Sequence, residues 1–213
     1  MADVKTVILA TNNAHKVSEI SHALDFPGWE FKTLRELGID SDPEEDADTF
    51  LGNARIKARA AHEASGGMAA LADDSGIVVD ALDGAPGVFS SRFAGEDATD
   101  QDNNDKLLAD LQGVPDEKRT ARFVCTLVFI DDDGTEFVAQ GKVEGRIGHE
   151  LQGSGGFGYD PLFWPDVFNG ECTLAEVPQE RKNEVSHRGN ALRSMRFKIE
   201  VAEAKKEGGM HQH

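Results

Sequence analysis

Residues 6–16 constrain the fold most, because an apolar run typical of a buried strand passes there directly into a polar turn and a helix. Backbone N–H groups at a helix start lack partners within the helix and carry partial positive charge. Thr11, Asn12, Asn13 and Lys16 add further donors, so the pattern indicates a corner that can bind phosphate. The glycine spacing of a Walker loop is absent, and the same arrangement is common in α/β proteins without such a ligand.

Strand and helix patterns alternate along the chain, which predicts an α/β fold with a mixed sheet flanked by helices. The length of 213 residues predicts one domain at 1–207, built of two lobes, and a flexible tail at 208–213 that contains His211 and His213. Helices are expected at 13–24, 49–64 and 101–111 and from about 186. Strands are expected at 68–72, 77–82, 119–130 and 136–147, the last two as an antiparallel hairpin.

The chain is strongly acidic, with 39 Asp plus Glu against 22 Lys plus Arg and a formal net charge of −17. A field of this sign repels nucleic acid and anionic membranes, and no run of basic residues offsets it, so neither partner is expected. No apolar stretch approaches the roughly 20 residues that cross a bilayer, and no secretory signal is visible. We therefore expect a cytoplasmic protein, in which Cys125 and Cys172 are reduced.

Two adjacent carboxylates, Asp73 and Asp74, follow an apolar run and precede another one. Ionised neighbours near a core edge repel each other, and a divalent cation such as Mg²⁺ relieves this because it prefers oxygen ligands. The alternative is an Asp-Ser turn whose side chains bind the local backbone. Glu44 and Glu45 lie in an acidic loop at 40–48, which either brings a further carboxylate to the same ion or is simply solvated.

Three further groups suit a nucleotide, and each has a structural alternative. Asn53 and Lys57 share a face of the second helix, where Lys57 faces a cleft or lies along the surface. The glycine-rich segment 153–158 lets backbone approach a ligand closely, and it carries aromatic rings that stack on a base or enter the core. Near the last helix, three cations form a donor cluster for a carbonyl or phosphate, or a capped helix start paired with acidic residues. The aromatic and cationic residues are Phe157, Tyr159, Lys182, His187 and Arg188.

Four motifs in this order, TNNAHK, LADDSGIVVDALDGAPGVFSSRFAG, GGFGYDPLF and SHRGNALR, closely resemble the inosine triphosphate pyrophosphatase family, also called non-canonical purine NTP pyrophosphatases. The resemblance covers nearly the whole chain, from Val7 to about Arg193. It implies Mg²⁺-dependent hydrolysis of ITP, dITP and XTP to the monophosphate and pyrophosphate. It also implies a homodimer of elongated α/β subunits, each with two lobes around a central cleft.

The resemblance also implies roles for residues that match its motifs. Asp74 accepts a proton and binds the metal, Asp73 supports that site, and Glu44 is the loop carboxylate that joins the ion. Gly52 departs from the Glu that the family often has there, and the choice of Glu44 over Glu45 is open. The residues implied to bind substrate are Thr11, Asn12, Asn13, Ala14, His15, Lys16, Asn53, Lys57, Ser75, Phe157, Gly158, Tyr159, Asp160, Lys182, His187 and Arg188.

Two other functions remain open on the sequence. A related nucleotide pyrophosphatase with another base preference would use the same phosphate chemistry. A nucleotide-binding protein without turnover would have no need of the paired carboxylates Asp73 and Asp74, which are costly to keep next to each other.

Overall fold

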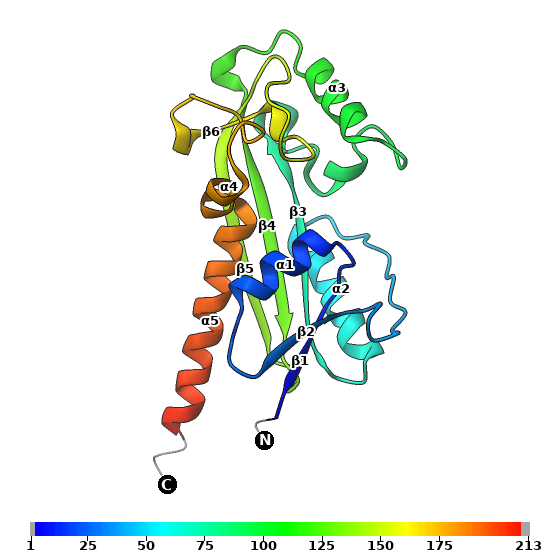
Figure 1. Cartoon of the computed structure of the whole chain (residues 1–213). Coiled ribbons are helices and arrows are strands. Elements are labelled where there is room, and N and C mark those ends of the chain that lie inside the picture. Colours follow the sequence, from blue (N-terminus) through cyan, green and yellow to red (C-terminus); the bar gives the residue numbers. More distant parts are fainter. Residues whose placement is uncertain (1–2, 210–213) are drawn as a thin grey trace. The chain divides into compact units, whose positions relative to one another are not determined.

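A six-stranded sheet carries the fold, with its strands in the order β2-β1-β3-β4-β5-β6 (Figure 1). The computed structural model describes residues 3–209. The strands are β1 (Lys5–Leu9), β2 (Trp29–Thr33), β3 (Ala69–Val79), β4 (Thr120–Ile130), β5 (Glu136–Ile147) and β6 (Phe163–Pro165). The helices are α1 (Ala14–Ala23), α2 (Phe50–Ala64), α3 (Asp100–Asp110), α4 (Gln179–Val185) and α5 (His187–Gly209). Because β1 is parallel to β2 and β3 while β5 is antiparallel to β6, the predicted mixed sheet is confirmed.

The chain divides into two compact units, each with its own buried core. The first comprises Met1–Asp74, Thr126–Gln140 and Ala191–His213, and the second comprises Ser75–Cys125 and Gly141–Asn190. The boundaries fall within β3, β4, β5 and α5, so these elements contribute residues to both units. The central cleft expected between two lobes stays a prediction.

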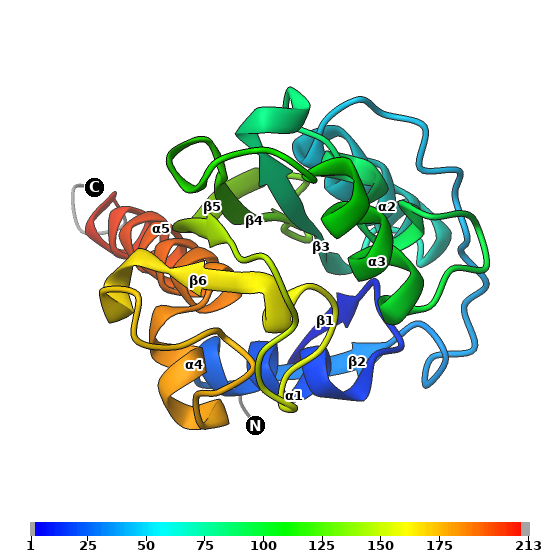
Figure 2. The ribbon, with the colours of Figure 1, turned by 90° about the horizontal axis from the view of Figure 1, so that it is seen from above.

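The first unit is built around β1, which lies between β2 and β3 and has three fully buried apolar residues. Helices α1 and α2 cover opposite faces of this part of the sheet (Figures 1 and 2), as right-handed crossovers from β1 to β2 and from β2 to β3 require for this strand order. α2 packs through Ala54, Ala58 and Ala61, whose small side chains let the helix approach the strands closely. Thr49 is the N-cap of α2, so this helix starts where the sequence predicted it.

The second unit has a core in which β3, β4, β5 and the start of β6 meet α3. Leu107 and Leu111 bury the expected stripe of α3 against Ile77 and Phe123. Arg119 is buried and donates to the carbonyls of four residues, Leu111, Val114, Ile147 and Gly148, at 2.8 to 3.0 Å. A buried charge is thus compensated by backbone oxygens, and the end of α3 is tied to the end of β5.

The structure corrects several expected elements. Residues 73–76 do not interrupt the sheet, because β3 is continuous and its polar residues extend a central strand. The N-cap of α3 is Thr99 instead of Asp100, since Thr99 and Asp102 form a capping box. A separate helix, α4, precedes the last one and was not predicted. Of the predicted tail, residues 208 and 209 belong to α5, and His211 and His213 lie outside the described residues.

No helix among residues 3–209 is long and apolar enough to cross a membrane.

Candidate active site

The phosphate corner, residues 11–16, lies between the end of β1 and the start of α1. Asn13 is the N-cap, and its Oδ1 accepts from the N–H groups of His15 at 3.0 Å and Lys16 at 3.2 Å. Thr11 Oγ1 accepts from the N–H of Asn13 at 3.1 Å. The side chains of Thr11 and Asn13 therefore shape the turn as acceptors, whereas the sequence suggested that they act as donors. Asn12 and Ala14 are exposed at this helix start, where the backbone dipoles favour an anion.

Two lysines and three carboxylates gather where β3 extends beyond the end of β1, forming what we call the lysine–carboxylate cluster. Lys16 Nζ lies 2.9 Å from Asp73 Oδ2. Lys57 Nζ donates to the backbone oxygen of Asp73, and it lies 3.1 Å from Glu45 Oε1 and 4.0 Å from Asp74 Oδ1. Ligands of open α/β sheets bind at the carboxyl ends of parallel strands where the crossovers diverge, and the cluster lies at such a point between β1 and β3.

Asp74 has the most perturbed environment of these carboxylates. Its side chain is 17% exposed, and its Oδ2 is buried without a hydrogen-bond partner. The pKa of Asp74 is raised from 3.8 to about 6. Burial is the largest cause, and the charges of Glu45 and Asp73 act in the same direction, whereas Lys57 and a hydrogen bond from Asn53 act in the opposite direction. A carboxylate with this pKa can accept a proton near neutral pH.

The structure favours Glu45 over Glu44 as the loop carboxylate. Glu45 reaches Lys57, whereas Glu44 is exposed. The loop is fixed by Asn53, whose Oδ1 accepts from the N–H of Ala47 at 3.0 Å. A Cβ on Gly52 would lie 2.6 Å from the Cβ of Ala47, so the glycine that departs from the family pattern lets the loop approach α2. Asn53, expected to bind substrate, thus anchors the loop.

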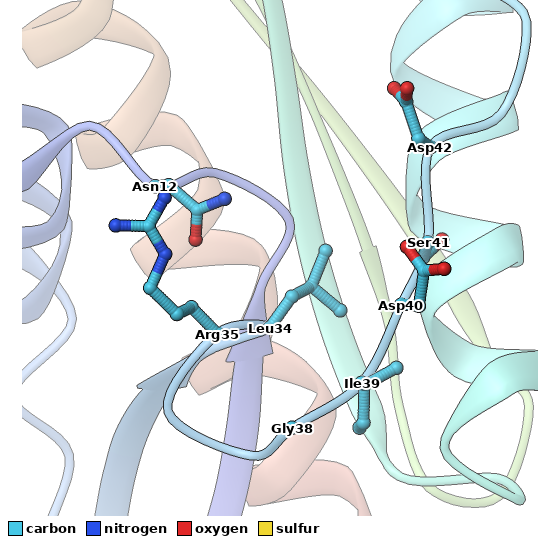
Figure 3. A pocket seen from close by; sticks show the side chains of 8 residues that line it. All are labelled: Asn12, Leu34, Arg35, Gly38, Ile39, Asp40, Ser41 and Asp42. Atoms are coloured by element: carbon cyan, nitrogen blue, oxygen red, sulfur yellow. The ribbon is translucent and has the colours of Figure 1, made fainter.

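The first unit also has a cavity of about 450 Å³ beside the phosphate corner (Figure 3). The guanidinium of Arg35 extends toward Asn12 along one wall, and Asp40 and Asp42 lie on the other side (Figure 3). Sequence reasoning missed Arg35. Its signal was the position two residues after the end of β2, because β1 and β2 are parallel and their carboxyl ends lie at the same edge.

A metal site of three or more His, Cys, Asp or Glu side chains does not occur within residues 3–209. Mg²⁺ bound with a phosphate ester needs only one or two protein carboxylates, because phosphate oxygens and water complete its shell. The unpartnered buried Oδ2 of Asp74 and the nearby Glu45 meet that requirement. The residues present therefore fit a metal that arrives with the phosphates, and Asp73 is engaged by Lys16.

In the second unit, Phe157 is an aromatic side chain that stays accessible, with 52% of its surface exposed. The ammonium of Lys182 lies 4.3 Å from the centre of its ring, in the range of a cation–π contact. Lys182 also pairs with Asp160, and both are almost fully buried. Asp160 Oδ2 accepts from the N–H of Phe157 at 3.0 Å, so the three residues form one unit that supports the ring. A Cβ on Gly156 would lie 2.3 Å from the same oxygen, which explains the glycine.

Tyr159 does not present a face for stacking, contrary to the sequence prediction. It is 5% exposed within the core of the second unit, and its hydroxyl donates to the carbonyl of Ser90 at 2.6 Å. Burial raises the pKa of Tyr159 above its ordinary value. The turn thus places one aromatic of the pair in the core and leaves the other exposed.

His187 and Arg188 begin α5 and are both buried. The His187 ring stacks on Phe123 with centroids 5.0 Å apart and an angle of 16° between the planes. Ser186 Oγ accepts from the N–H of Gly189 at 3.0 Å and so caps the helix. Lys182, expected at the entry to the last helix, lies on α4. Ser75, the first residue of this unit, has a buried Oγ without a hydrogen-bond partner.

The predicted residues thus fall into two sets. Lys16, Lys57, Asp73 and Asp74 meet in the first unit, and Phe157, Asp160 and Lys182 meet in the second. Convergence of Lys16 and Asp74 with Arg188 stays a prediction.

Together, the fold and these two sets define an α/β protein with a cationic edge of the sheet that suits an anion and an exposed aromatic ring, Phe157, that is supported by Asp160 and Lys182. The model of the Ham1 family matches residues 7–198. This chain belongs to the Ham1 family, which confirms the resemblance seen in the motifs.

Relatives and solved structures agree over most of the chain. A "dITP/XTP pyrophosphatase" of Desulforamulus reducens is 49% identical over 187 residues, which are 88% of this chain and 92% of the relative. One of Photorhabdus laumondii subsp. laumondii is 48% identical, over 90% of this chain and 96% of the relative. A HAM1 protein from Coxiella burnetii has a TM-score of 0.86 and 38% identity, covering 93% of this chain and 100% of that chain. A structure titled nucleoside-triphosphatase / dITP/XTP pyrophosphatase from Mycobacterium abscessus has a TM-score of 0.76 and 39% identity, and the match covers 88% of this chain and 95% of that chain.

Proposed function

We propose that this chain hydrolyses the purine nucleoside triphosphates ITP, dITP and XTP to the monophosphate and pyrophosphate, with Mg²⁺, and so removes them from the nucleotide pool. The observation that carries this proposal is Asp74, a partly buried carboxylate with a pKa of about 6 beside Lys57. Names of relatives support the substrate class. The homodimer and the cytoplasmic location stay predictions.

The lysine–carboxylate cluster binds the triphosphate when Lys16 and Lys57 exchange their carboxylate partners for phosphate oxygens. A nucleoside triphosphate has about four negative charges, and positioning with charge neutralisation supplies most of the catalysis in phosphoryl transfer. Lys16 and Lys57 are held by Asp73 and Glu45 in the absence of substrate, so they are already aimed at this edge. The exposed corner and Arg35 extend the positive wall toward the distal phosphates.

Asp74 accepts the proton of the attacking water. Burial keeps its pKa high enough for efficient proton acceptance, and Lys57 keeps a large fraction ionised at neutral pH. Asp74 and Glu45 would hold Mg²⁺, with Asp73 in support, and when bound the ion supplies charge neutralisation and acidifies water. Attack at the α-phosphorus releases pyrophosphate, whose charge Lys16 and the corner stabilise.

The assay that tests this function is release of pyrophosphate from ITP, dITP, XTP and ATP. We expect turnover of the first three with Mg²⁺, loss of turnover with EDTA, and recovery with excess Mg²⁺. ATP should be hydrolysed at least about 100-fold less efficiently, because unmatched polar groups discriminate strongly. Preference for a modified pyrimidine triphosphate would show that the chain is instead a related nucleotide pyrophosphatase with another base preference. Tight binding of ITP without turnover would show that it is a nucleotide-binding protein.

Arg188→Ala tests the base preference. We propose that Lys182, His187 and Arg188 supply the donors that meet the 6-oxo group of hypoxanthine or xanthine, where adenine has an amino group. The variant should raise the Michaelis constant for ITP by roughly tenfold, which is the magnitude expected for loss of a charged hydrogen bond. The ratio of kcat/KM for ITP to kcat/KM for ATP should fall. An unchanged ratio in a folded variant, checked by circular dichroism, would contradict the assignment.

A further inference from the structure

Gly158, the residue after the exposed Phe157, is held on both sides by α3. Its N–H donates to Asp100 Oδ2 at 2.9 Å, and its carbonyl accepts from Asn104 Nδ2 at 2.9 Å. Asp100 and Asn104 are four residues apart and therefore share one face of the helix. We call this pair of contacts the Gly158 clamp.

The clamp fixes the backbone on which the Phe157 ring stands. Phe157 projects a half-exposed ring, and its own N–H is held by Asp160. Gly158 has a φ of +58°, a left-handed conformation that its missing side chain permits. Besides the clamp, the turn is held by the bond from the Phe157 N–H to Asp160, by the bond from the Asp160 N–H to the Phe157 carbonyl and by Lys182 over the ring, but none of these contacts holds Gly158 itself. Ordering a loop residue costs roughly 1 to 2 kcal/mol in entropy, so loss of the clamp releases Gly158.

Helix α3 is itself rigid at the end that holds the clamp. Thr99 and Asp102 form a capping box at its start. Asn103 accepts from the N–H of Ala94 at 2.8 Å and donates to the carbonyl of Ser91 at 3.1 Å, so the first turn is tied to a second segment. The clamp thus joins a flexible glycine turn to an anchored helix.

Asn104 is an unusual choice for stability alone. It is 3% exposed, and its Oδ1 is buried without a hydrogen-bond partner, although its Nδ2 is used. A buried oxygen left unsatisfied offsets most of the gain from the single bond, and an apolar side chain of the same branched shape, such as leucine, would avoid this cost. The amide is therefore better explained by the position that it gives Gly158 than by its contribution to folding.

We propose that Asp100 and Asn104 are positioning residues for base recognition, and that they act by holding the Phe157 ring in its stacking orientation through Gly158. This inference rests on the proposed function, because it takes Phe157 as the ring on which the purine stacks. The clamp lies wholly within the second unit, so its loss should weaken recognition of the base and leave phosphate binding unchanged.

Asn104→Leu removes the donor and the unsatisfied oxygen and keeps the branched shape of the side chain. We expect the Michaelis constant for ITP to rise about fivefold to tenfold, the effect of one lost hydrogen bond, with kcat within about twofold of wild type. The ratio of ITP to ATP efficiency should fall, while inhibition by inorganic tripolyphosphate, which lacks a base, should not change. Gln101→Ala on the same helix is the matched control, since Gln101 is exposed and bonds only to Asp105.

Asp100 offers a rescue experiment. Asp100→Ala should reproduce the rise in the Michaelis constant, whereas Asp100→Asn keeps an acceptor for the N–H of Gly158 and should restore most of the wild-type value. Equal effects of the two substitutions would show that the charge at the helix start matters instead of the clamp, and would overturn the role of Asp100.

A double-mutant cycle separates positioning from general destabilisation. If Asn104 acts through the ring, Asn104→Leu should have no further effect on the Michaelis constant in a Phe157→Ala background. Additive effects, or a wild-type constant in Asn104→Leu alone, would overturn the proposal.

Hydrogen exchange of residues 153–160 provides a readout that does not depend on ITP turnover. Exchange should be faster in Asn104→Leu than in wild type and Gln101→Ala, and equal exchange would overturn the clamp itself. Absence of ITP hydrolysis by the wild type would instead refute the proposed function.

Discussion

Asp74→Asn is expected to lower the turnover of ITP by about 1,000-fold, within the usual range for loss of a general base, while making the substrate-free protein more stable. Both effects have one physical cause. Burial and the neighbouring carboxylates make the ionised form of Asp74 unfavourable, and the same unfavourable charge is what allows it to accept a proton. Pyrophosphate release with Mg²⁺ measures the first effect.

The gain in stability should depend on pH in a defined direction. The pKa of Asp74 is about 6 in the folded chain and 3.8 ordinarily. Between pH 3.8 and pH 6 the folded chain therefore holds a proton on Asp74 that the unfolded chain has lost. The contribution of the protonated Asp74 carboxyl to the stability of the fold is complete below about pH 4 and is lost as the pH rises through 6. At pH 8 the ionised group therefore destabilises the fold by at most about 3 kcal/mol, and asparagine removes that charge.

Thermal unfolding in EDTA at pH 8 and pH 5 measures this effect. We expect Asp74→Asn to unfold a few degrees above wild type at pH 8, with a smaller difference at pH 5, where the wild-type carboxyl is largely protonated. Asp3→Asn, at an exposed carboxylate, is the matched control and should change neither unfolding nor turnover. A variant that is less stable at pH 8, or that keeps near-normal turnover, would contradict the role of Asp74.

Lys57→Met should reduce kcat/KM for ITP by about 100-fold, because it removes a cation that binds phosphate and holds Asp74 ionised. The second role has a separate signature. Lys57 lowers the pKa of Asp74, so its loss raises that pKa, and the acidic limb of the pH profile of kcat/KM should move to higher pH.

Two substitutions make this experiment specific. Lys57→Arg keeps the positive charge and should leave the acidic limb near its wild-type position, even where kcat/KM falls. Lys32→Met removes a lysine that pairs with Glu30 on β2, away from the cluster, and should have no effect on the profile. An acidic limb that does not move in Lys57→Met would show that this limb reports another group.

Local signals explain why much of the fold could be predicted. Asn13 and Thr49 cap helices whose starts were predicted at residues 13 and 49, because capping is decided by residues two or three positions apart. The alanine stripe of α2 was visible at helical spacing and is buried. The capping box at Thr99 was missed only because Asp100, one residue later, is an equally plausible cap.

The errors at the site have a different origin. Asp73 to Gly76 carry every local mark of a turn, yet they continue β3, since a central strand gains hydrogen bonds on both sides and lysines from α1 and α2 compensate its carboxylates. Glu44 and Glu45 are equivalent in sequence, and only the fold of the loop over Gly52 brings Glu45 to Lys57.

The sequence alone determined the family, the chemistry-bearing residue types and most helices and strands, because these depend on ordered motifs and on periodicity over a few residues. The tertiary structure decided which partners each charge has: Lys16 with Asp73, Lys57 with Glu45 and Lys182 with Asp160. It also buried Tyr159 and left Phe157 exposed. Such pairings join residues far apart in the chain, and the desolvation that raises the pKa of Asp74 exists only once they pack around it.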